Sequence, residues 1–184
     1  TGAIAAWENA ARLAADGRFG ANKLRLYASQ NAPFTIMYDS WKAHSRELVP
    51  MTPEEGRQNA EVILGKVLSN RKPPYSLAGG LFDVLEKSGG DMFKVSNDEI
   101  VSWVVKYFSL EGYDLFPASA CAVSSLKQAL DAGIVKHDET VMLNVTGGGM
   151  LGATRKGFIL KEPDLILSPD LPAEEIIAAV DKLF

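Results

Sequence analysis

Three consecutive glycines follow a short apolar run late in this 184-residue chain. Residues 141–152 read VMLNVTGGGMLG, in which Thr146 directly precedes the glycines. The apolar run predicts a strand over residues 140–145, and ligands of α/β proteins bind at the carboxyl ends of strands. The glycines either permit a tight turn with positive φ or leave room for a planar ligand against the backbone. In the second case the Thr146 hydroxyl group could hydrogen-bond a ring atom.

Nucleotide-binding patterns fit these glycines poorly. Gly147, Gly149 and Gly152 satisfy G-x-G-x-x-G, but a dinucleotide unit needs a helix directly after the turn, whereas ATRKGFILKEPD contains Gly157 and a strand-like run. A Walker phosphate loop needs a Lys-Ser or Lys-Thr pair that is missing here. Both interpretations are therefore set aside.

Metal and triad chemistry have little support. His44 and His137 are far apart and isolated, so neither a metal site nor a nucleophilic triad is expected. Arg155 and Lys156 could attract an anion such as a phosphate group, although a solvated basic pair explains them more simply.

The elements that must position these residues alternate between helix and strand patterns. Helices are expected over residues 3–15, within 34–41, in the second half of 54–68, and over 76–87, 97–108, 117–132 and 173–183. Strands are expected over 23–29, 91–96, 140–145, 158–160 and 165–167, with a short extended piece at 113–116. Ser29, Gln30 and Asn31 follow the first strand and could touch substrate, although a polar turn explains them equally well.

This alternation implies parallel pairing with right-handed crossovers. We therefore expect one α/β domain over residues 1–184, built as a three-layer α/β/α sandwich with a mainly parallel sheet.

Composition excludes several partners. The net charge is -4, so nucleic acid is not an expected partner. No apolar stretch approaches the roughly 18 residues that span a bilayer. Cys121 is the single cysteine and reads as a buried, inert thiol. A cytoplasmic protein is expected.

Several segments resemble the threonine synthase family, which are pyridoxal phosphate enzymes of fold type II. The similar segments are TGAIAAWENAARL (1–13), SNDEIVSWVVKYFSLEGYD (96–114), FPASACAVSSLKQAL (116–130) and TGGGMLG (146–152). The stretches DGRFG, SQNAPF and LNVTGGGMLG are most similar to the cysteate synthase branch. The resemblance implies replacement of the phosphate of O-phosphoserine by sulfite, which gives cysteate for coenzyme M biosynthesis.

The resemblance also assigns residues to the cofactor. Thr146 would bond the pyridine nitrogen and Gly147 would pack near the ring. Thr1 and Gly2 would complete the phosphate cradle at a helix N-terminus, although an N-cap and its neighbour would look the same.

Two departures from the family pattern limit these assignments. Phe116 stands where most of the family has Glu before Pro. The family's Schiff-base lysine belongs to an N-terminal portion that precedes Thr1, so no catalytic residue is expected here. The chain is thus expected to be a C-terminal fragment, inactive alone and without covalently bound cofactor. Its expected partners are the N-terminal domain of the same protein and a second copy of the enzyme. Threonine synthase, a non-catalytic ligand-binding module and a structural domain remain the alternatives.

Overall fold

The computed structural model describes residues 1–149, 157 and 162–183. Its contacts divide the chain into two compact units, Thr1–Gly152 and Ala153–Phe184, which are described separately. The expectation of one domain over residues 1–184 stays a prediction. In the part that the structure describes, no helix is long and apolar enough to cross a membrane.

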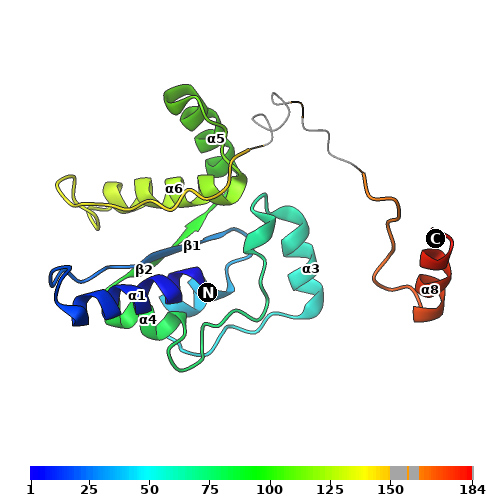
Figure 1. Ribbon diagram of the computed structural model, residues 1–184, viewed down its shortest axis with the longest axis horizontal. Coiled ribbons are helices and arrows are strands. Elements are labelled where there is room, and N and C mark those ends of the chain that lie inside the picture. The colour runs from blue at the N-terminus through cyan, green and yellow to red at the C-terminus, as the bar shows by residue number, and fades with distance from the viewer. Residues whose placement is uncertain (150–156, 158–161, 184) are drawn as a thin grey trace. The chain divides into compact units, whose positions relative to one another are not determined.

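Helices surround and connect two strands in the first unit, which confirms the α/β class (Figure 1). Its elements are α1 (Gly2–Asp16), β1 (Tyr27–Asn31), α2 (Ile36–Lys42), α3 (Pro53–Val62), the 3-10 helix η1 (Lys66–Leu68), α4 (Leu81–Ser88), β2 (Asp91–Val95), α5 (Asn97–Glu111) and α6 (Pro117–Asp131). The second unit contains α8 (Ala173–Asp181).

The two strands pair in parallel, as the alternation of elements predicts. The register sets Tyr27 opposite Asp91 and Asn31 opposite Val95, so both strands end at the same edge. Met92 joins a core cluster with side chains of α2 and α4, while Phe93 joins another with Ala129 of α6. Neighbouring residues of a strand point to opposite faces, so apolar packing covers both sides of this small sheet.

Three strand predictions need correction. Residues 140–145 form no strand, because their backbone finds no ladder partner among the described residues, and Met142 is 82% exposed. A single antiparallel bridge nearby, within the described part of the chain, joins Leu115 to Gly148. Residues 165–167 also lack strand structure. The first strand begins at Tyr27 instead of residue 23, because Tyr27 pairs with Asp91, the first residue of β2. The strand expected over 158–160 lies outside the described residues.

Two helix predictions were wrong in their limits. In the segment 54–68 the first half is helical, because Thr52 and Glu55 form a capping box with Pro53 in the first turn. The helix expected from residue 76 begins only at Leu81. A side chain at Gly80 would approach three backbone carbonyl oxygens at 2.7 Å, so the chain turns tightly there first.

A carboxylate joins α5 to α6. Ser96 and Glu99 form a capping box, in which the Glu99 carboxylate accepts from the Ser96 amide at 2.8 Å. The same carboxylate accepts from Gln128 Nε2 on α6 at 2.7 Å. Burial alone would raise the pKa of Glu99, but these hydrogen bonds prevail and lower it. The charged form of Glu99 therefore stabilises the fold.

Cys121 is fully buried on α6, as expected. Burial raises the pKa of its thiol to about 11, which keeps it protonated and unreactive near neutral pH.

Stability should fall in acid through Glu99. A lowered folded-state pKa gives stability that is present above the unfolded value of about 4.3 and is lost as the pH drops through the folded value. Glu99→Gln should therefore lose more free energy of unfolding at pH 6 than at pH 3, by urea titration. The exposed Glu8→Gln is the control, and an equal loss for Glu99→Gln at both pH values would contradict the prediction.

Candidate functional site

The glycine turn packs directly against the start of α6. The Gly147 amide donates to Ser119 Oγ at 3.0 Å, and the Gly147 carbonyl accepts from the Phe116 amide at 3.0 Å. The Gly149 amide donates to the Asp114 carbonyl at 2.9 Å. Two segments some thirty residues apart, both singled out by the family resemblance, thus form one structural unit.

Close packing explains Gly147. A Cβ atom there would lie 2.8 Å from Phe116 Cβ and 3.2 Å from Ser119 Oγ, whereas at Gly148 nothing lies within 4 Å. Neither glycine has a positive φ, so the first of the two alternatives, a turn that needs positive φ, does not explain these positions. Phe116, which replaces the family's Glu, forms part of the surface that Gly147 contacts.

Thr146 stands exposed beside this unit. Because residues 140–145 form no strand, Thr146 does not lie at a strand end, and only the resemblance still assigns it to a cofactor. Gly147 lines a shallow hollow of about 240 Å³ with Tyr107 and Asp114. Thr1 does not line that hollow, so the structure does not bring the two halves of the predicted cofactor site into one pocket.

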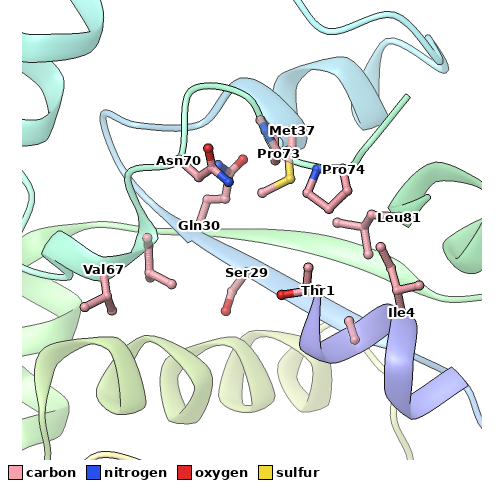
Figure 2. A pocket seen from close by; sticks show the side chains of 12 residues that line it. Thr1, Ile4, Ser29, Gln30, Met37, Val67, Asn70, Pro73, Pro74 and Leu81 are labelled. Atoms are coloured by element: carbon pink, nitrogen blue, oxygen red, sulfur yellow. The ribbon is translucent and has the colours of Figure 1, made fainter. Parts of the chain in front are cut away.

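A second pocket, of about 260 Å³, lies where α1 begins (Figure 2). Thr1 is the N-cap of α1, as expected, although its side chain makes no capping hydrogen bond. Ser29 and Gln30 of β1 line the same pocket, and so does Asn70. Gly2, whose added Cβ would meet nothing within 4 Å, is exposed next to it. We call this cavity the α1 pocket.

Asn31, by contrast, has a structural role. Its side chain is fully buried and donates to the Val95 carbonyl at 3.0 Å and to Asn97 Oδ1 at 3.1 Å. Its own Oδ1 accepts from the Gly65 amide at 2.9 Å. The prediction that Ser29, Gln30 and Asn31 follow the first strand was wrong, because all three lie within β1. Ser29 and Gln30 line the pocket, and Asn31 binds the loop that precedes η1.

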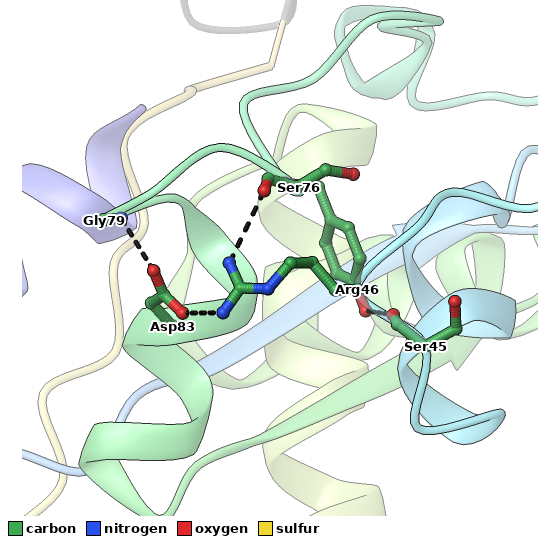
Figure 3. Close-up of polar contacts among 6 residues, drawn as sticks. Ser45, Arg46, Ser76, Gly79 and Asp83 are labelled. Atoms are coloured by element: carbon green, nitrogen blue, oxygen red, sulfur yellow. Dashed lines mark hydrogen bonds and ion pairs between the residues drawn. The ribbon is translucent and has the colours of Figure 1, made fainter.

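A polar cluster holds the loop that carries Pro73 and Pro74 to the α1 pocket (Figure 3). Arg46 pairs with Asp83 and also donates to the Ser76 carbonyl at 3.4 Å. Asp83 in turn accepts from the Gly79 amide at 2.7 Å. The hydroxyl group of the buried Tyr75 donates to the Ser45 carbonyl at 2.9 Å, and burial raises the pKa of Tyr75 to about 12. The sequence gives no local signal for the contacts of Arg46 with Asp83 and of Tyr75 with Ser45, because these pairs are 37 and 30 residues apart.

The remaining candidates from the sequence are metal ligands and a basic pair. Among the described residues, no group of three His, Cys, Asp or Glu side chains could hold a metal ion. Arg155 and Lys156 lie outside the described residues.

Comparison with known proteins gives a consistent result. The chain is 40% identical to cysteate synthase of Methanosarcina acetivorans over 96% of its own length, and 41% identical to that of Methanocella paludicola over 98%. The cysteate synthase of Methanoculleus marisnigri is 45% identical over 81% of the chain. This chain resembles cysteate synthases. The resemblance inferred from its motifs is thereby confirmed.

The matched region is only part of each relative. The chain spans 43% of the cysteate synthases from M. acetivorans and M. paludicola and 35% of that from M. marisnigri. No protein-family model matches the chain.

The packing role of Gly147 can be tested against its neighbour. Gly147→Ala should lower the free energy of unfolding by about 1–3 kcal/mol, because the new methyl group meets Phe116 Cβ, which cannot rotate away. Gly148→Ala should change it by less than about 0.5 kcal/mol. Equal effects in urea unfolding would contradict this explanation.

Asn31 should be far more important for stability than an exposed asparagine. Asn31→Ala leaves the buried Gly65 amide without its acceptor and should cost about 2–4 kcal/mol of unfolding free energy. Asn9→Ala, on the exposed side of α1, is the control. A loss no larger than that of the control would show that the network is dispensable.

Proposed function

We propose that this chain is the C-terminal part of a pyridoxal phosphate-dependent cysteate synthase. The reaction replaces the phosphate on the β-carbon of O-phosphoserine: the C–O bond to phosphate breaks, and the sulfur of sulfite forms a C–S bond. The observation that carries the proposal is 40–41% identity to cysteate synthases over 96–98% of the chain. The chain matches only 43% of the length of these relatives, which supports the proposal that it belongs to a longer protein.

The α1 pocket fits the phosphate end of the cofactor. Its lining contains no charged side chain, and the first amides of a 15-residue helix begin at its edge. Backbone N–H groups and the helix dipole favour an anion at that place. Thr1 and Gly2 would therefore hold the phosphate, as the motif resemblance implies.

Thr146 would meet the ring of the cofactor. Its hydroxyl group is exposed and available, and the adjacent Gly147 backbone is fixed by Ser119 and Phe116. A neutral hydroxyl group can orient the pyridine nitrogen without protonating it fully. The bound cofactor supplies the electron sink that β-replacement requires.

The rest of the enzyme would come from outside this chain. We propose that the N-terminal part of the same protein contributes the Schiff-base lysine and further strands, which would extend the small parallel sheet into a three-layer α/β/α sandwich. The chain by itself would then carry no covalently bound cofactor. We propose a second copy of the enzyme as a further partner.

The function can be tested in a full-length protein that contains this chain. Cysteate and phosphate should form from O-phosphoserine and sulfite, while phosphohomoserine should give no threonine. Turnover of phosphohomoserine alone would overturn the substrate assignment.

The assignment of Thr146 needs its own variant. In the same full-length protein, Thr146→Val keeps the side-chain shape but removes the hydroxyl group, and should slow cysteate formation about tenfold or more. Thr140→Val, at an exposed position of the same segment, should leave the rate unchanged. The absorption spectrum of the bound cofactor should also change in Thr146→Val, and an unchanged spectrum and rate would remove Thr146 from the site.

A further inference from the structure

Gln30 lines the α1 pocket and carries a buried hydrogen-bond donor that has no partner among the described residues. Its side chain is only 1% exposed, and its Oε1 accepts from the Tyr38 amide at 2.8 Å. That bond fixes which end of the side-chain amide is the oxygen, so the Nε2 group must face the other way. Nε2 has no hydrogen-bond partner in the part of the chain that the structure describes, although Gln30 lines the pocket (Figure 2).

An unpaired donor in this position is unusual. Leaving a buried N–H group unsatisfied costs about 1–3 kcal/mol. The neighbouring Asn31 uses both ends of its amide within the protein, and Gln128 on α6 donates from its own Nε2 to Glu99 and to the Lys94 carbonyl. An acceptor bound in the pocket would restore the missing hydrogen bond of Gln30.

The surroundings indicate what kind of acceptor fits. The start of α1 gives the pocket a partial positive charge, and no carboxylate lines it to repel an anion. Ile4, Met37 and Leu81 provide apolar surface on the same pocket. A small oxyanion attached to an organic group matches both features, because its charge faces the helix and its body contacts the apolar side chains.

We propose that Gln30 donates from Nε2 to an oxygen atom of a small organic oxyanion, a phosphate monoester or a carboxylate, that binds at the N-terminus of α1. The identity of that anion rests on the proposed function, whereas the role of Gln30 as a donor does not. It adds a binding residue from β1 to the backbone cradle formed by Thr1 and Gly2.

The unaltered 184-residue chain provides the first test. Side-chain amide signals of Gln30 in ¹⁵N NMR spectra should shift on titration with inorganic phosphate or O-phosphoserine, while those of the exposed Gln58 should not. Parallel titrations with acetate and with serine show whether a carboxylate group without phosphate also shifts the Gln30 signals. N-terminal acetylation should preserve the shift, because it removes the charge of the Thr1 amino group but leaves the helix amides.

A variant tests the donor itself. Gln30→Glu keeps an oxygen for the Tyr38 amide but replaces Nε2 with oxygen, so affinity for inorganic phosphate should fall about tenfold or more. Gln58→Glu adds the same charge on the surface of α3 and should leave the affinity unchanged.

Different results would contradict this inference and the proposed function. Absence of any Gln30 signal shift at saturating phosphate and O-phosphoserine would overturn the inference, even if Gln30→Glu failed to fold. If the full-length protein makes cysteate but Gln30 does not respond, only the inference fails. If Gln30 responds but no cysteate forms, only the proposed function fails.

Discussion

The parallel pairing of β1 with β2 is the constraint on which the candidate site depends. Parallel strands end at the same edge, so the register of Asn31 opposite Val95 brings the end of β1 beside the start of α5. The Asn31 side chain then bonds Val95 and Asn97 across that edge. Gln30, one residue earlier, is fixed by the same pairing and faces the α1 pocket.

The glycine turn shows that two explanations of one motif can apply to different residues. Gly147 is small because Phe116 and Ser119 lie against it, which is a packing requirement. Gly148 has open space beside it, and Thr146 is exposed and does not pack in the core. The turn is thus anchored on one side and accessible on the other. Such an arrangement suits a loop that must hold a hydroxyl group at a fixed place next to a ligand.

Buried polar groups separate structural from binding residues in this fold. The amide of Asn31 is satisfied within the protein, whereas that of Gln30 keeps one donor unpaired. Around Gln30 the pocket depends on dipoles and neutral donors and has no cationic side chain in its lining. Anion recognition without a fixed cation favours a ligand whose charge is also held by backbone amides.

The sequence by itself determined the α/β class, α1, α6, the strand at residues 91–95 and the similarity to cysteate synthases, because caps, periodicity and motifs are local. It misjudged residues 140–145, since an apolar run becomes a strand only when another strand offers hydrogen bonds. Tertiary structure alone decided that Gly147 packs on Phe116 and that Gln30 and Asn31 have different roles. Those outcomes depend on which distant segments meet, and no local pattern of residues encodes that.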